Sequence, residues 1–216
     1  ALTNHRHEVV VVDVARRRMR VVDRSRFDRI AGIAWSPDGR WIAYGMAVSP
    51  HRSVIRVAPT AGGLPRTVTD AVLQDVAPSF DPGGKYLHFL SRRVFNPVYD
   101  NLQFEISFPR GMRPYLVTLR RDLRSPFSPE PKEPRPEGKE KGDGDAPRRP
   151  TRVRIDFAGI AGRVVPYPVP DGRYRRIRGI RVGGLLDGLL GTAGRRRSNS
   201  LLAMRHLIPS RPARES

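Results

Sequence analysis

The strongest constraint on the fold of this chain is a hairpin sequence that occurs twice. The segment IAWSPDGRWIAY occupies residues 33–44, and SFDPGGKYLHF occupies residues 79–89. Corresponding positions, such as Trp41 and Tyr86, lie 45 residues apart. A repeat of this length, built from short strands, is typical of one blade of a β-propeller. We therefore expect stacked antiparallel sheets, with each hairpin packed against the next blade.

The turn within each hairpin follows from its residues. Pro37 presets φ at the first corner, Asp38 can bond nearby backbone amides, and Gly39 accepts a positive φ. Asp81 begins the corresponding turn of the second hairpin. We interpret Asp38 and Asp81 as turn residues rather than as ligands or acid catalysts. Runs of β-branched and aromatic residues predict further strands at 9–14, 19–22, 54–58, 66–70 and 116–119.

The predicted fold class is all-β, a partial β-propeller with two to three four-stranded antiparallel blades, a disordered insertion and an irregular basic tail. Four ranges follow: blades at 1–119, a Pro/Glu/Lys-rich insertion at 120–151, continuing propeller strands at 152–174, and an Arg/Gly-rich tail at 175–216. The insertion has few apolar side chains, so it cannot bury enough surface to offset its ordering entropy. In the third range, Ile155 and Phe157 alternate with polar residues as in a strand.

The formal net charge of +19 raises the question of nucleic-acid binding. Lysine occurs at only four positions, so Arg supplies 36 of the 40 basic residues. This bias is what GC-rich coding DNA produces, and the tail has no aromatic residue to stack on bases. We therefore do not expect nucleic acid to be the partner, although a basic nucleic-acid-binding protein is kept as a third reading.

Several function classes are not expected from the residues present. There is no cysteine, which removes disulfides and thiolate metal sites and fits a reducing compartment. We find no transmembrane segment or signal peptide, so no membrane partner is expected. The histidines lie outside any recognisable nucleophile motif and are too few in one place for a metal site. We expect no catalytic residue, no metal and no cofactor in this chain.

A longer stretch resembles a known family. LSRRVFNPVYDNLQFEISFPRGMRPYLVTLRRDLRSPFSP, then the insertion, then RIDFAGIAGRVVPYPVPDGRY is similar to the second propeller of the tricorn protease family. The resemblance covers about residues 1–174. It implies a cytoplasmic serine peptidase that trims oligopeptides, with propellers that gate peptides and a catalytic centre in later domains after a PDZ-like module. The chain is then expected to be a truncated homologue, with a frameshift or degenerate coding past about Arg175.

The resemblance also directs attention to cationic residues that could meet a peptide. Arg92, Arg93 and Arg113 are candidates to bind a peptide's carboxylate end. Oligopeptides are the implied partners. The alternative is a TolB-like propeller module for protein–protein interaction, which would self-associate as a homo-oligomer to cover its open sheet edges.

Overall fold

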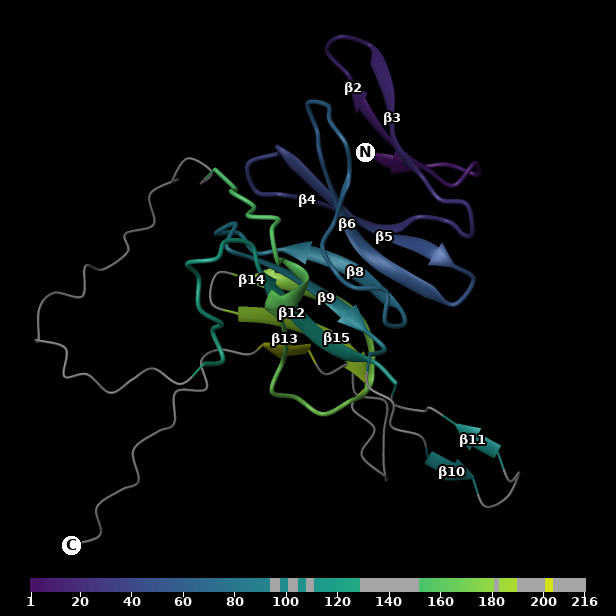
Figure 1. The fold of residues 1–216 in the computed structure, drawn as a ribbon, viewed down its shortest axis with the longest axis vertical. Helices are drawn as coiled ribbons and strands as arrows, with labels where there is room; N and C mark the ends of the chain where they lie inside the picture. Colours follow the sequence, from purple (N-terminus) through teal and green to yellow (C-terminus); the bar gives the residue numbers. More distant parts are fainter. Residues whose placement is uncertain are drawn as a thin grey trace, which may run out of the picture.

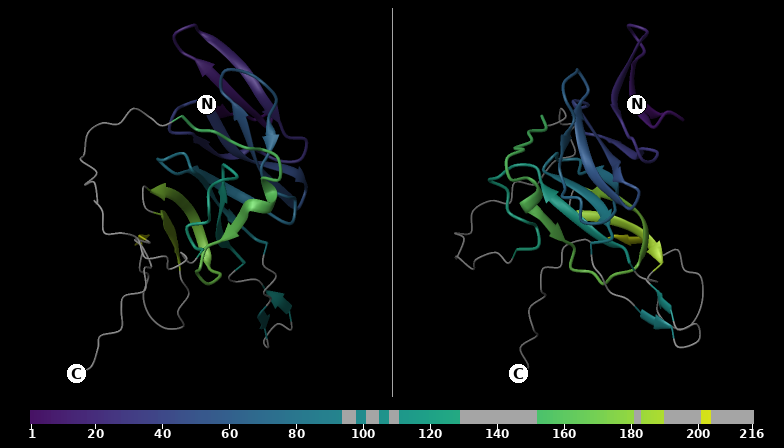
Figure 2. Two further views of the ribbon diagram at one scale, coloured as in Figure 1. Left: turned by 60° about the vertical axis from the view of Figure 1, so that its left-hand side comes forward. Right: turned by 45° about the vertical axis from the view of Figure 1, so that its right-hand side comes forward.

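The chain forms a series of antiparallel sheets that follow one another from the N-terminus to β15 (Figures 1 and 2). The computed structural model describes residues 1–93, 98–100, 105–107, 111–128, 152–180, 183–189 and 201–203. No α-helix occurs in these ranges, and a single 3₁₀ turn, η1, spans Ala161–Arg163. The all-β fold class and the partial propeller are thus confirmed, and the blade-like sheets are antiparallel throughout.

Two sheets are complete four-stranded blades. The first contains β4 (Ala31–Trp35), β5 (Trp41–Ser49), β6 (Arg52–Pro59) and β7 (Arg66–Thr67). The second contains β8 (Asp75–Phe80), β9 (Tyr86–Ser91), β12 (Arg113–Thr118) and β13 (Val164–Pro166).

Three smaller sheets are also present in the part of the chain that the structure describes. The first contains β1 (Leu2–Thr3), β2 (Glu8–Asp13) and β3 (Arg18–Arg24). Between β9 and β12 lies a hairpin of β10 (Val98–Asp100) and β11 (Glu105–Ser107). The last sheet contains β14 (Arg173–Ile180), β15 (Gly183–Leu189) and β16 (Leu201–Ala203).

The two sequence repeats have the same strand register. Trp35 faces Ile42 across β4 and β5, and Phe80 faces Leu87 across β8 and β9. Strands β4 and β8 also have a β-bulge at equivalent positions of the repeat, where Gly32 has φ 67° and Ala77 has φ 52°. The repeat therefore extends from the turn into the backbone geometry of the strands.

Side chains bond the backbone of both repeated turns, as expected. The amide of the aromatic residue after the turn is accepted by Ser36 in the first turn and by Asp81 in the second. In the first turn, Ser36 Oγ accepts the Trp41 amide and Asp38 Oδ1 accepts the Arg40 amide. In the second turn, Asp81 Oδ1 accepts the amides of both Lys85 and Tyr86. Burial raises the pKa of Asp81, and the three backbone amides that bond it oppose that shift.

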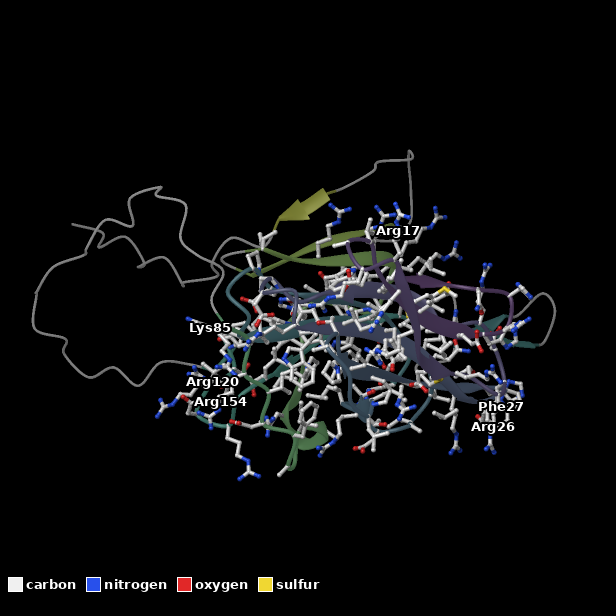
Figure 3. All side chains as sticks on the ribbon, turned by 90° about the horizontal axis from the view of Figure 1, so that it is seen from above. Arg17, Arg26, Phe27, Lys85, Arg120 and Arg154 are labelled. Atoms are coloured by element: carbon white, nitrogen blue, oxygen red, sulfur yellow. The ribbon has the colours of Figure 1, made fainter. Side chains whose placement is uncertain are left out.

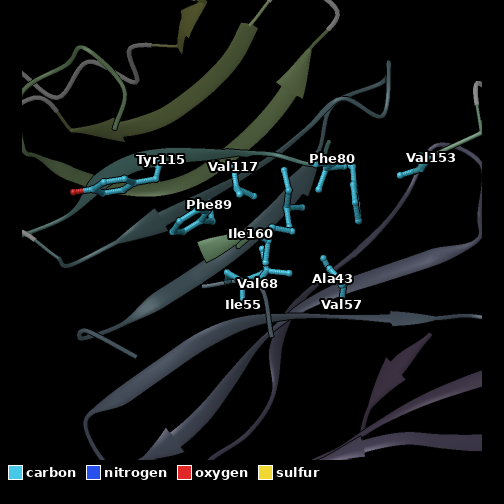
Figure 4. Packing of buried hydrophobic residues seen from close by; sticks show 12 residues of the cluster. Ala43, Ile55, Val57, Val68, Phe80, Phe89, Tyr115, Val117, Val153 and Ile160 are labelled. Atoms are coloured by element: carbon cyan, nitrogen blue, oxygen red, sulfur yellow. The ribbon is translucent and has the colours of Figure 1, made fainter. Parts of the chain in front are cut away.

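The apolar cores lie between neighbouring sheets. One cluster joins the two complete blades and includes Ile55 and Val57 from β6 with Phe89 and Val117 from the next blade (Figure 4). A second cluster joins the N-terminal sheet to the first blade, through Val9 and Tyr44 among others. A third lies between the second blade and β14 and includes Leu90, Leu116 and Ile177. Each blade is thus stabilised by burial of one face against the next.

Residues 152–163 differ from the strand expected there. The segment is extended and then turns into η1 before β13, with no ladder partner among the described residues. Its apolar side chains pack across the blades: Phe157 lies 5.7 Å from Trp41 between ring centroids, and Val153 is buried. The Val153 amide also donates to Asp38 Oδ2 at 2.7 Å. The alternation thus reflects packing between two blades rather than pairing within one.

The tail also differs from the expectation that regular structure ends near Tyr174. Strand β14 continues to Ile180 and pairs with β15, so residues 175–180 and 183–189 are not irregular. Gly179 packs against the backbone of Asp81, where a side chain would clash, and its amide donates to Ser79 Oγ. Of the insertion expected at 120–151, residues 120–128 are described, and Phe127 packs against Tyr167 with 4.7 Å between the ring centroids. The rest of that range and the remainder of the tail lie outside the described residues, apart from β16.

Candidate functional site

The antiparallel order of the strands divides their connections between two faces. We call one the loop face, formed by residues 25–30, 50–51, 68–74, 92–93, 111–112 and 167–172. We call the other the turn face, which includes the hairpin turns at 36–40 and 81–85. Arg92, Arg93 and Arg113 all flank the connection from β9 to β12, so the structure brings the three candidates to the loop face.

The Arg93 guanidinium forms an ion pair with the buried carboxylate of Asp75. Its Nη2 lies 2.6 Å from Asp75 Oδ2 and its Nε lies 3.2 Å from Asp75 Oδ1. The Asp75 side chain is 1% exposed and that of Arg93 is 15% exposed. The guanidinium also lies over the rings of Phe89 and Tyr115, at 5.6 and 5.8 Å from their centroids. A bidentate ion pair in this setting holds Arg93 in place and neutralises its charge.

Asp75 is itself fixed by two serines. Ser91 Oγ donates to Asp75 Oδ1 at 2.6 Å, and Ser53 Oγ accepts the Asp75 amide at 3.0 Å. Ser53 belongs to β6 of the preceding blade. The Asp75–Arg93 pair therefore joins the start of β8 to the end of β9 and is tied to the neighbouring blade.

Arg113 has a different environment. It lies beside Ser91 across the β9–β12 pairing, and its Nη2 donates to the Tyr167 carbonyl at 3.1 Å. Its Nε is buried without a hydrogen-bond partner, and no described carboxylate lies within ion-pair distance of it. The Arg113 charge affects the neighbouring phenol of Tyr115. Burial raises the pKa of Tyr115, and the charges of Arg113 and Arg93 oppose that increase.

Arg92 is held only through its backbone. Its amide donates to the Gln74 carbonyl at 3.0 Å, and its side chain is exposed. Of the three candidates, Arg93 is therefore part of the structural framework, Arg113 is partly buried and not paired with a carboxylate, and Arg92 is solvated.

His88 has a hydrogen-bond partner that the sequence did not predict. His88 is 1% exposed on β9, and its Nδ1 lies 2.7 Å from the Tyr167 hydroxyl. Burial raises the pKa of the Tyr167 phenol, so the hydroxyl stays protonated at neutral pH, and the His88 tautomer determines which of the two groups donates the hydrogen bond. Burial likewise lowers the pKa of His88 to about 4. The two residues are 79 positions apart, and no local pattern could have paired them.

Two further observations concern the described residues only. They contain no group of three or more His, Cys, Asp or Glu side chains arranged to hold a metal ion. They also contain no helix that is long and apolar enough to cross a membrane.

Comparison with known proteins identifies the family. The model of the "Tricorn protease second beta propeller domain" matches residues 1–199. Tricorn protease homolog 1 of Streptomyces coelicolor is 36% identical over 199 residues, which cover 89% of this chain and 19% of that protein. The tricorn protease homolog of Saccharolobus solfataricus is 32% identical over 180 residues, covering 83% of this chain and 15% of that protein.

One solved structure of a tricorn protease agrees with this match. The crystal structure of the tricorn protease aligns with a TM-score of 0.67 and 26% identity, over 88% of this chain and 18% of that one. A TolB protein from Agrobacterium tumefaciens aligns with a TM-score of 0.38 and 21% identity, over 52% of this chain and 37% of that one.

These matches also show how much of its relatives this chain covers and how far along the chain the family match extends. The chain spans less than a fifth of the length of the tricorn relatives described above. The family match continues past Arg175 to residue 199, which contradicts a loss of the reading frame near Arg175. Together with the stacked antiparallel blades, the matches show that this chain belongs to the tricorn protease second β-propeller domain family.

Proposed function

We propose that this chain guides oligopeptides within a tricorn-type serine peptidase of the cytoplasm, while bond cleavage is performed by other parts of the full-length protein. In this proposal the loop face contacts the peptide, and Arg113 binds its C-terminal carboxylate. The family supports a role in proteolysis, since the relatives are named as proteases.

The single observation that carries the assignment is the state of the Arg113 guanidinium. Arg93 is already neutralised by Asp75, whereas Arg113 has one hydrogen bond to a carbonyl and a buried Nε with no partner. A guanidinium in that state gains from a carboxylate, because a charge-assisted hydrogen bond contributes about 1.5–3 kcal/mol.

The test compares one oligopeptide with a free C-terminal carboxylate and the same peptide with a C-terminal amide, using the full-length peptidase. Arg113→Ala is expected to lower kcat/KM about tenfold for the free acid and to leave the amide nearly unchanged. Arg154→Ala is the matched control, since Arg154 is exposed and its only carboxylate partner is Asp156 in the segment that follows the insertion. Equal losses for both peptides, or no loss for either, would reject Arg113 as the carboxylate-binding residue.

A further inference from the structure

Three large apolar side chains are exposed at the loop-face end of the first blade. Phe27 is 50% exposed, and Val48 and Leu73 are each 39% exposed. Phe27 lies on the connection between β3 and β4, Val48 lies near the end of β5, and Leu73 lies on the connection between β7 and β8. An isolated exposed apolar residue is ordinary, but a group of them on one face marks an interaction surface.

Hydrogen bonds hold these connections together. Ser25 Oγ donates to the Ala47 carbonyl at 3.2 Å and accepts the Phe27 amide at 3.3 Å, which sets Phe27 beside the end of β5. The Ser53 amide donates to the Leu73 carbonyl at 2.8 Å, which sets Leu73 beside the start of β6. The apolar side chains are thus presented by anchored backbone, so little ordering entropy is lost when a partner binds.

The surroundings of these side chains are basic. Arg26 and Arg29 flank Phe27 in sequence, and Arg52 begins β6 next to Leu73. All three arginine side chains are exposed, and none of them has a carboxylate within ion-pair distance among the described residues. Asp28 and Asp70 are the exposed carboxylates in the same connections, so positive charge is in excess.

We infer that Phe27, Val48 and Leu73, with Arg26, Arg29 and Arg52, form a docking surface for an acidic protein segment that carries bulky apolar side chains. Aromatic residues and arginine are the residue types enriched where protein interfaces gain most of their affinity. The arginine rim selects a partner of opposite charge.

Figure 3 shows Arg26 and Phe27 at the opposite end of the molecule from Lys85, Arg120 and Arg154, so the surface is separate from the turn face. It also does not involve Arg113, and its test is independent of the proposed carboxylate site.

The experiment measures binding of a fluorescent synthetic peptide in which Glu alternates with Leu and Phe, using the full-length peptidase. Phe27→Ala and the pair Arg26→Glu with Arg29→Glu are each expected to weaken binding about tenfold. Leu64→Ala and Arg154→Glu are the matched controls, since Leu64 is 85% exposed on the connection between β6 and β7, and Arg154 is exposed in the segment after the insertion. These two changes are expected to leave binding unchanged.

A counterpart peptide with Lys in place of Glu, and vesicles containing phosphatidylserine, complete the design. The counterpart is expected to bind at least tenfold more weakly, because its charges match those of the arginine rim. Absence of acidic-peptide binding, equal losses in the control variants, or preferential binding to the vesicles that is lost with Phe27→Ala would each overturn the inference. The last outcome would assign the surface to a membrane instead of a protein.

Discussion

Arg93 and Asp75 form a bidentate ion pair at the loop face, with one carboxylate oxygen bonded to Nη2 at 2.6 Å and the other to Nε at 3.2 Å. Asp75 begins β8 and Arg93 follows the end of β9, and the carboxylate is almost completely shielded from water. An arginine that sequence reasoning assigned to substrate therefore has a structural partner. This is why the proposed peptide contact is assigned to Arg113.

Removing the arginine of this pair should destabilise the blade. Arg93→Met leaves the Asp75 carboxylate buried without its cation, and the expected loss of unfolding free energy is about 3 kcal/mol. Arg92→Met, at an exposed neighbouring position, should change it by less than about 0.5 kcal/mol. Urea unfolding of the two variants checks the difference, and a similar effect at both positions would show that the pair contributes little.

The glycines of the two repeated turns allow the cost of a left-handed backbone to be separated from the cost of overpacking. Gly39 and Gly84 have φ of 70° and 64°, but a methyl group on Gly39 would have no atom within 4 Å, whereas one on Gly84 would lie 2.6 Å from Val153 Cγ2. Gly39→Ala should cost about 1 kcal/mol for the left-handed backbone. Gly84→Ala should cost about 3 kcal/mol, because overpacking against Val153 is added. Equal costs, measured by urea unfolding, would show that residues 152–163 do not pack on the second turn.

The buried His88 should make stability depend on pH. Its pKa falls from 6.5 to about 4 on folding because burial disfavours the charged ring. The unfolded chain therefore binds the proton more readily, so stability is complete above about pH 6.5 and decreases as the pH falls toward 4. The total loss from this group is about 3 kcal/mol.

The variant His88→Gln keeps a polar group beside Tyr167 but cannot titrate. Urea unfolding of the wild-type chain and of this variant at pH 7 and pH 5 isolates the histidine contribution. We expect the wild type to lose more stability than the variant over that interval. Identical pH dependence in the two proteins would mean that His88 is accessible to protons in the folded state.

The hairpins could be predicted from sequence because their chemistry is local. Proline, aspartate and glycine define the turns at 37–39, and the 45-residue spacing fixes the second copy. Long-range packing was not predictable in the same way. The alternation around Phe157 looked like a strand, yet its side chains pack against Trp41 from outside any sheet. The Gly-rich stretch after Tyr174 lacked strand propensity, yet Gly179 is required for close approach to Asp81.

Residues at equivalent positions of the repeat can also differ in exposure, because their surroundings differ. Trp35 and Phe80 occupy matching positions opposite Ile42 and Leu87, but Trp35 is 44% exposed and Phe80 is 7% exposed. Phe80 belongs to the apolar cluster that joins the two complete blades, whereas Trp35 belongs to none of the three apolar clusters. The candidate site shows the same effect of context, since the sequence does not distinguish Arg93 from Arg113, whereas in the structure Arg93 pairs with a buried carboxylate and Arg113 does not.

Photo-cross-linking of a peptide to the full-length peptidase tests the peptide-guiding role most directly. An oligopeptide with a photoreactive group on its C-terminal residue is irradiated with the enzyme, and the labelled residues are mapped by mass spectrometry. The account predicts labelling on the loop face near residues 91–93 or 113–115, with loss of that label in Arg113→Ala. Labelling confined to the turn face, at residues 36–40 or 81–85, would contradict it.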